Sequence, residues 1–305
     1  MPNARSNILL VQCDSMDGRL MGCMGHPAAV TPHMDRMAER GVLFRNAYCN
    51  SPLCVPSRAS MFSGLYTHHC EAWNNINGLE ETTPTFLNRF TAGGYATLVH
   101  GGTDYLSGQH TLRAQLSAHT RSANLHLPVW PKLKPPRVEK TNPRRRTPID
   151  MASLDWPMLD RFCEALTASA TSSQPFFAYC GIGTPHPPFS TLQYWHDLID
   201  PEKIDMPGQT QWRHPTADYK RAVFRLNDAL PPETIRAYRR VYLAMIAETD
   251  AMLGQVLETL EKTKAADSTC VIFISDHGEM AFEHGQHAKM TLYDPAVRVP
   301  MIVTG

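Results

Sequence analysis

The chain of 305 residues is 43% hydrophobic and 19% charged, the composition of a globular protein that forms one large domain or two small ones. Its 29 basic side chains balance its 29 acidic ones, which argues against a nucleic-acid binder, because such proteins need an excess of Lys and Arg. No stretch approaches the roughly 20 apolar residues that span a bilayer. We therefore expect neither a nucleic-acid nor a membrane partner.

The N-terminal region and the cysteines indicate where in the cell the chain is located. The run from Asn7 to Gln12 is apolar but too short for the core of a signal peptide, and it follows a polar N-terminus. The eight cysteines contain no C-x-x-C pair, and we expect most of them to be reduced thiols. The sequence thus predicts a cytoplasmic chain as given, or an extracytoplasmic one if a further N-terminal segment precedes it.

Short apolar runs recur along the chain and predict buried strands. Their hydrophobic residues do not alternate with polar ones, as expected where helices cover both faces of a parallel sheet. The predicted strands are residues 7–12, 94–99, 175–180, 269–275 and 299–303. Helical patterns lie between them, at 31–40, 155–168 and 232–264. This alternation predicts an α/β fold in which helices sandwich a mostly parallel central sheet.

The stretch 127–148 differs from its surroundings. It holds six prolines and the basic run Arg144-Arg145-Arg146. Because proline cannot donate a backbone hydrogen bond, we interpret the stretch as an exposed loop or insertion rather than part of a sheet. We expect one domain over residues 1–305 that contains this insertion.

The segment from Asn50 to Gly64 carries the pattern Cys54-Val-Pro-Ser-Arg58 and ends in Ser-Gly. It resembles the signature of the sulfatases, a family with the alkaline-phosphatase-like fold. The resemblance implies that a maturation enzyme oxidises Cys54 to formylglycine, an aldehyde whose hydrate attacks the sulfur of sulfate esters, and that Arg58 holds the modified side chain. A thiol cannot complete this reaction, because a sulfated thiol has no adjacent hydroxyl to expel sulfate. The alternative is a buried loop cysteine beside a turn proline.

Two acidic segments, far apart in the sequence, resemble the metal ligands of the family. Asp14 follows the first predicted strand, and Asp276-His277 follows the strand 269–275. Parallel strands would bring them to one edge of the sheet, where ligands of open α/β folds bind. With the modified Cys54 they would form a site for a divalent cation, Ca²⁺ in the first place and Mg²⁺ as the alternative. A single Asp after a strand would otherwise be interpreted as a turn cap.

Two further residues are assigned from the resemblance. His186, in the sequence Thr184-Pro-His-Pro187, matches the histidine that contacts sulfate and protonates the departing oxygen in the family. Lys289 matches the lysine that binds the sulfate oxygens. With Arg58 they would surround the sulfuryl group with positive charge. On their own, they would be interpreted as a structural histidine and a surface lysine.

The resemblance covers residues 7–305 and is greatest to the arylsulfatase K subgroup, which implies a sulfated carbohydrate such as a 2-O-sulfated uronate, or another small sulfate ester, as substrate. Ser15 replaces the second aspartate of the family, as it does in this subgroup. Gly102 stands where the family has a lysine that bridges formylglycine and sulfate, and loss of such a contact costs roughly 10²–10³ in rate. His100 and His110 are the nearby side chains that could replace this cation. The chain ends at Gly305, where the family continues into a smaller C-terminal subdomain, so we expect that subdomain to be missing.

Two alternative functions remain open from the sequence. A phosphate mono- or diester hydrolase of the same fold would handle a similar tetrahedral oxyanion, although the Cys54 signature favours sulfate. A degenerate domain that binds sulfated sugars without turnover would explain Gly102. We interpret the chain as a metal-dependent sulfuric ester hydrolase ahead of both.

Overall fold

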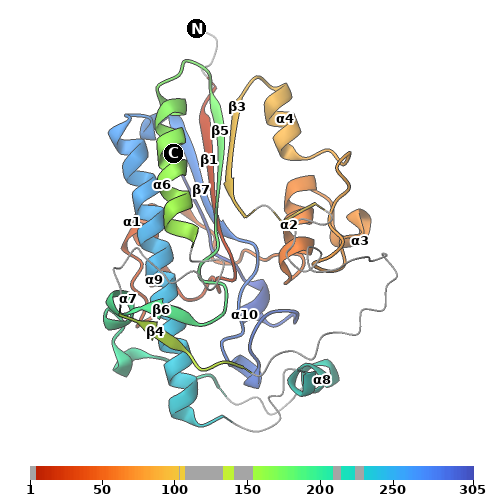
Figure 1. Cartoon of the computed structure of the whole chain (residues 1–305), viewed down its shortest axis with the longest axis vertical. Coiled ribbons are helices and arrows are strands. Elements are labelled where there is room, and N and C mark those ends of the chain that lie inside the picture. Colours follow the sequence, from red (N-terminus) through yellow and green to blue (C-terminus); the bar gives the residue numbers. More distant parts are fainter. Residues whose placement is uncertain (1–4, 103, 107–132, 141–153, 209–213, 224–229) are drawn as a thin grey trace.

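A computed structural model describes residues 5–102, 104–106, 133–140, 154–208, 214–223 and 230–305. Six strands form the central sheet in the order β2-β8-β7-β1-β5-β3 (Figure 1). Four of them, β1, β3, β5 and β7, run parallel, while β8 pairs antiparallel with β7 and β2 antiparallel with β8. The strands are β1 (Asn7–Cys13), β2 (Val42–Leu43), β3 (Ala96–Gly101), β5 (Phe176–Ile182), β7 (Thr269–Ser275) and β8 (Met301–Thr304). The predicted fold class, an α/β fold with a mostly parallel sheet, is confirmed.

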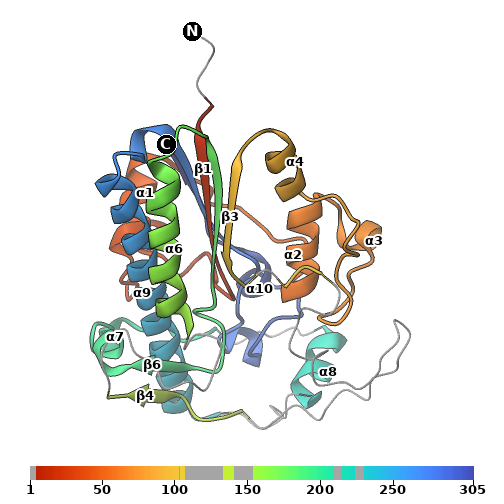
Figure 2. The same cartoon turned by 45° about the horizontal axis from the view of Figure 1, so that its top comes forward.

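Helices cover the sheet in two layers, seen from two directions in Figures 1 and 2. On one side lie α1 (Pro32–Arg40), α6 (Asp155–Ala170) and α9 (Pro232–Lys262). On the other side lie α2 (Cys54–Ser63), α3 (Thr67–Cys70) and α4 (Phe86–Ala92). The short helices α7 (Gln193–Asp197), α8 (Pro215–Val223) and α10 (Asp294–Val297) lie toward the carboxyl ends of the parallel strands (Figure 2).

The long helix α9 anchors the larger part of the core. Prolines at its start occupy positions where a helix needs no backbone donor, and its apolar positions recur with helical spacing. Its side chains Tyr242, Met245, Met252 and Val256 are fully buried in the cluster that also contains residues of β1 and β5. In the described part of the chain, no helix is both long and apolar enough to cross a membrane.

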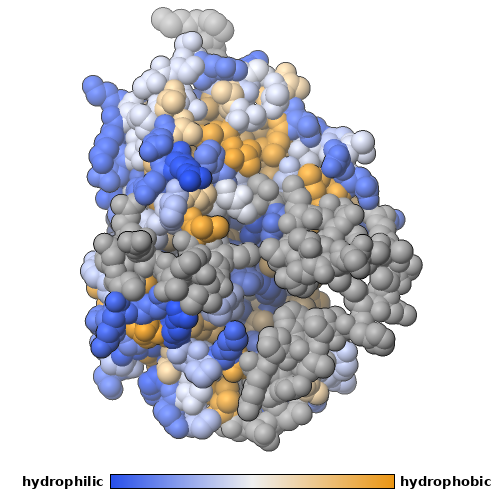
Figure 3. Space-filling model, in the orientation of Figure 1, coloured by the Kyte–Doolittle hydropathy of each residue, from blue (hydrophilic) through white to orange (hydrophobic). Residues whose placement is uncertain are grey.

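The predicted strands 94–99 and 299–303 overlap β3 and β8, but the edges of the sheet differ from the prediction in two ways. β5 is buried along its whole length, but in β3 exposed residues alternate with half-buried ones, because β3 is an edge strand. Figure 3 shows hydrophobic atoms at the surface over β3, between α6 and α4, where Val99 is exposed. The antiparallel edge pair of β2 and β8 was not foreseen, since two residues of β2 give no periodic signal.

The interpretation of 127–148 as a loop without sheet structure is wrong for its middle. Arg137–Glu139 forms β4, which pairs with β6 (Ser190–Leu192) in a separate two-stranded sheet. Proline at 135 and 136 does not prevent this pairing, because both residues precede the strand. Residues 127–132 and 141–148, with the basic run, lie outside the described residues.

Candidate active site

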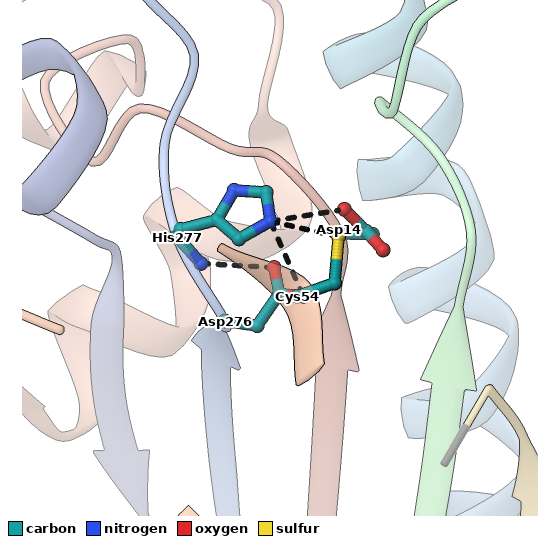
Figure 4. Close-up of side chains that lie close together, drawn as sticks. All are labelled: Asp14, Cys54, Asp276 and His277. Carbon is teal, nitrogen blue, oxygen red and sulfur yellow. Dashed lines mark hydrogen bonds and ion pairs between the residues drawn. The ribbon is translucent and has the colours of Figure 1, made fainter. Parts of the chain in front are cut away.

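The carboxyl ends of two neighbouring strands bring the two acidic segments together. Cys13 at the end of β1 is paired in register with Ser275 at the end of β7, so the residues that follow, Asp14 and Asp276, leave the sheet side by side. With Cys54 and His277 they form a buried cluster in which one ligand atom from each residue lies within 4.8 Å of the others (Figure 4). The structure therefore brings together the four residues predicted as metal ligands.

Cys54 lies at the first turn of α2, buried with 3% of its surface exposed. The next residue, Val55, donates its backbone N–H to Asn75 Oδ1 at 3.1 Å, which fixes the start of the helix. The helix dipole makes this end of α2 electropositive. An oxygen nucleophile at residue 54 would thus be held where negative charge is stabilised.

His277 presents one ring nitrogen to the cluster. Its Nδ1 lies 3.0 Å from the carbonyl oxygen of Gly278, which can only accept, so Nδ1 carries the hydrogen. The other nitrogen, Nε2, lies 3.3 Å from Cys54 Sγ and 3.7 Å from Asp14 Oδ1 (Figure 4). Burial lowers the pKa of His277, which favours the neutral ring that metal ions bind.

Arg58 ties the two acidic segments to each other from the second turn of α2. Its Nη2 donates to Asp14 Oδ2 at 2.8 Å and its Nε to Asp276 Oδ2 at 2.9 Å. Burial alone would disfavour ionised Asp14, but nearby His186 and Arg58 hold the pKa of its carboxyl below the ordinary range. Both carboxylates are therefore compensated inside the protein, as buried charges must be.

Lys289 reaches the same cluster from the loop after β7. Its Nζ donates to Ser15 Oγ at 3.3 Å, and Ser15 Oγ in turn donates to Asp14 Oδ1 at 2.8 Å. Burial would lower the pKa of Lys289, but Cys54 and the two aspartates raise it, so the ammonium stays charged. Ser15, which stands where the family has a second aspartate, thus connects Lys289 to the acidic cluster.

His186 follows β5 and is half-buried. It interacts electrostatically with Asp14, and its Nδ1 contacts the carbonyl of Pro187. The buried carboxylate of Asp155 holds the start of this loop, because it accepts from the backbone N–H of Gly183 at 2.9 Å and of Thr184 at 2.8 Å. Asp155 was not identified from the sequence, since its contact with the loop joins residues 28 positions apart.

Gly102, where the resemblance to the family implies a lysine, meets Arg58 through its backbone carbonyl. Arg58 Nη1 donates to the Gly102 carbonyl at 2.7 Å, and the hydroxyl of Tyr179 lies 2.9 Å from the same oxygen. His100 does not replace the missing cation, because its ring packs edge-on against Phe162 beneath α6. His110 lies outside the described residues. Tyr179 was not singled out in the sequence either, since it is an ordinary core residue of β5.

The donor set of the cluster fits a hard divalent cation with one condition. Two carboxylates suit such an ion, whereas the imidazole and above all the cysteine thiol are softer ligands than Ca²⁺ and Mg²⁺ prefer. An oxygen in place of the sulfur at residue 54 would bring the donor set closer to the one that these ions prefer.

The central sheet, its helical layers and this buried cluster at the carboxyl ends of the strands belong to the alkaline-phosphatase-like fold, and comparison with solved structures agrees. A phosphonate monoester hydrolase of Agrobacterium radiobacter superposes with a TM-score of 0.76 at 22% identity, over 98% of this chain and 68% of that one. A 2-O GAG sulfatase superposes with a TM-score of 0.70 at 25% identity, over 99% of this chain and 64% of that one.

The family assignment follows from the sequence comparison. The Sulfatase family profile matches residues 6–305, and the chain belongs to this family. Arylsulfatase K of Gallus gallus is 36% identical over 99% of this chain, and arylsulfatase K of Homo sapiens is 35% identical over 98%. The chain spans 59% and 58% of the length of these two relatives.

Proposed function

We propose that this chain is the catalytic part of a sulfuric ester hydrolase that acts on a sulfated sugar, such as a 2-O-sulfated uronate, through formylglycine at residue 54. The observation that carries the proposal is the buried convergence of Asp14, Cys54, Asp276 and His277 within 4.8 Å. The similarity to arylsulfatase K and to a 2-O GAG sulfatase supports the substrate class.

Two groups that the chain itself does not contain complete the proposed chemistry. Formylglycine would supply a hydrated aldehyde, with one hydroxyl as the nucleophile for sulfur and a second that would allow sulfate to be released. Asp14, Asp276 and His277 would hold a divalent cation, in our proposal Ca²⁺, which would supply charge to polarise the sulfate ester. A formylglycine-generating enzyme is the partner that this proposal requires.

The chain's own residues orient the ester and move the proton. Arg58 holds both aspartates beside residue 54, and in the proposed reaction Lys289 binds the sulfate oxygens while Ser15 positions its ammonium. His186, near Asp14 and only half-buried, gives a proton to the alcohol oxygen as the ester bond breaks. In the proposed reaction these cations would stabilise the negative charge that develops on the sulfate.

The test compares three esters on protein produced together with the maturation enzyme. We expect turnover of 4-nitrophenyl sulfate to exceed that of 4-nitrophenyl phosphate and bis(4-nitrophenyl) phosphate, and Cys54→Ala to abolish it, because the nucleophile is lost. Cys70→Ala is the matched control, since Cys70 lies on α3 outside the cluster and should leave the rate unchanged. Faster cleavage of a phosphate ester would favour the phosphate hydrolase, and no cleavage of any ester would favour the degenerate binding domain.

A further inference from the structure

Tyr242, in the interior of α9, is a buried residue that contacts the loop leaving β1. Its ring belongs to the hydrophobic core, and the residue has no exposed surface. Its hydroxyl donates to the backbone carbonyl of Ser15 at 2.7 Å and accepts from the backbone N–H of Asp17 at 3.0 Å. Because Ser15 and Asp17 are buried as well, this hydroxyl supplies partners for two backbone groups that are shielded from water.

Ser15 adopts a left-handed backbone conformation, with a φ of 66°. This conformation is costly for residues other than glycine and persists where the surrounding structure enforces it, often at ligand sites. In it, the N–H of Ser15 donates to Asp276 Oδ1 at 3.2 Å, and its Oγ donates to Asp14 Oδ1 at 2.8 Å. The same Oγ accepts from Lys289 Nζ at 3.3 Å. Ser15 thus connects both acidic residues and the lysine to one turn of backbone.

Tyr242 is the partner of this turn at two points. Among the residues that the structure describes, only Tyr242 donates to the Ser15 carbonyl, and only Tyr242 accepts from the N–H of Asp17. Met16, between them, is held separately, because its N–H donates to Ser275 Oγ at 3.0 Å. Without the Tyr242 hydroxyl, one carbonyl and one N–H would be left unpaired inside the protein, which is costly. The turn would recover partners by changing its backbone, and the strained residue Ser15 is the one that gains most from such a change.

We propose that Tyr242 is a positioning residue of the site: its hydroxyl holds Ser15 in the left-handed conformation and so sets Asp14 for the cation and Lys289 for the sulfate. The inference rests on the proposed sulfatase function and adds to it a residue outside the four-residue cluster. When this hydroxyl is removed, Ser15 relaxes and its Oγ moves away from Asp14 and Lys289. Residues that orient metal ligands from outside typically contribute about 10- to 100-fold to metal affinity, so the loss is measurable.

The first test measures Ca²⁺ affinity, because Asp14 is the proposed ligand on which Tyr242 acts through Ser15. The whole chain, produced together with the maturation enzyme and freed of metal by a chelator, is titrated calorimetrically with Ca²⁺, with and without Tyr242→Phe. This substitution removes a single oxygen atom. We expect it to weaken Ca²⁺ binding about tenfold, the lower end of the range for such residues.

The matched control is Tyr238→Phe. Tyr238 lies one turn earlier on α9 and is 3% exposed, but its hydroxyl donates to the carbonyl of Lys134 at 2.7 Å, outside the cluster. The two variants lose the same atom from the same helix, so a general loss of stability would affect both of them alike. Tyr238→Phe should leave the Ca²⁺ affinity unchanged.

Hydrogen exchange in the metal-free protein supplies a second readout, one that does not depend on the cation. We expect Tyr242→Phe to speed exchange in the peptides that contain Ser15 and Lys289 and to leave exchange in β5 unchanged, because the turn opens locally. Tyr238→Phe should change exchange in neither of these two peptides.

Equal Ca²⁺ affinity in Tyr242→Phe and the wild type, an equal loss in both variants, or faster exchange throughout the sheet would overturn the inference. Should Tyr242→Phe not fold, Ser15→Ala takes its place, because it removes the oxygen through which Tyr242 acts on Asp14. Unchanged Ca²⁺ affinity in Ser15→Ala would then contradict the inference. If the wild type binds no Ca²⁺, the proposed metal site fails, and hydrogen exchange alone decides the role of Tyr242. Cleavage of 4-nitrophenyl sulfate by the wild type tests the sulfatase proposal separately.

Discussion

Arg58 holds three acceptors at once, the carboxylates of Asp14 and Asp276 and the backbone oxygen of Gly102. A Cβ added to residue 102 would lie 2.9 Å from its Nη1 atom. A side chain at 102 must therefore shift the guanidinium, which is fixed by its other partners. The observed position of Arg58 therefore requires a residue without a side chain at position 102.

A pair of substitutions at residue 102 separates the effect of bulk from that of charge. We expect Gly102→Ala to lower kcat for 4-nitrophenyl sulfate, because the methyl group displaces Arg58. Gly102→Lys places a Cβ at the same point near Arg58 and adds an ammonium near the sulfate. Its kcat should therefore exceed that of Gly102→Ala by about tenfold or more. Equal kcat values in the two variants would show that the site does not use a cation at this position.

At the scale of elements, the first turn of α6 fixes the loop that carries His186. Asp155 accepts from Gly183 and from both the backbone and the hydroxyl of Thr184. Burial raises the pKa of Asp155 to about 6, although these donors favour the ionised form. The folded protein therefore binds a proton here more tightly than the unfolded chain, whose aspartate titrates near pH 4.

The sign of this shift gives a stability prediction. The contribution of Asp155 to stability is greatest below about pH 4 and falls as the pH rises through 6, by roughly 3 kcal/mol in total. Asp155→Asn has no such dependence, so the difference in free energy of unfolding, wild type minus variant, should decrease from pH 4 to pH 7. Denaturant unfolding at these two pH values measures it, and a difference that stays constant or grows would contradict the prediction.

Some elements of the site could be predicted from sequence and others could not. Asp14 and Asp276 each follow an apolar strand, so parallel pairing alone predicts that they meet, and the pattern around Cys54 is specific. The hydrogen bonds of Asp155 with Gly183 and Thr184 join segments that lie far apart in the sequence and leave no local pattern. The conformation of residues 279–290 could not be foreseen because their left-handed residues are mostly not glycine.

The central strands and the longest helix could also be predicted, because their hydrophobic patterns are local in the sequence. Continuous apolar runs identify β1, β5 and β7, and the helical spacing of α9 is unambiguous over its length of 31 residues. β2 and β4 were missed, since strands of two and three residues at sheet edges depend on tertiary pairing rather than on their own composition. Roles in catalysis for Arg58, His186 and Lys289 remain predictions.

For the molecule as a whole, burial of Cys54 restricts when it can be oxidised. The residue is 3% exposed in the first turn of α2, beside the ends of β1 and β7, where a modifying enzyme would not reach it in the folded state. The conversion that we propose would therefore have to occur before the chain folds. Protein that has already folded should keep its thiol when it is incubated with the maturation enzyme.

Mass spectrometry of the peptide that contains Cys54 measures this conversion directly. We predict formylglycine at residue 54 in protein synthesised together with the maturation enzyme, and the unmodified thiol in protein that meets the enzyme only after folding. The thiol alone in protein from both preparations would remove the nucleophile on which the proposed reaction depends.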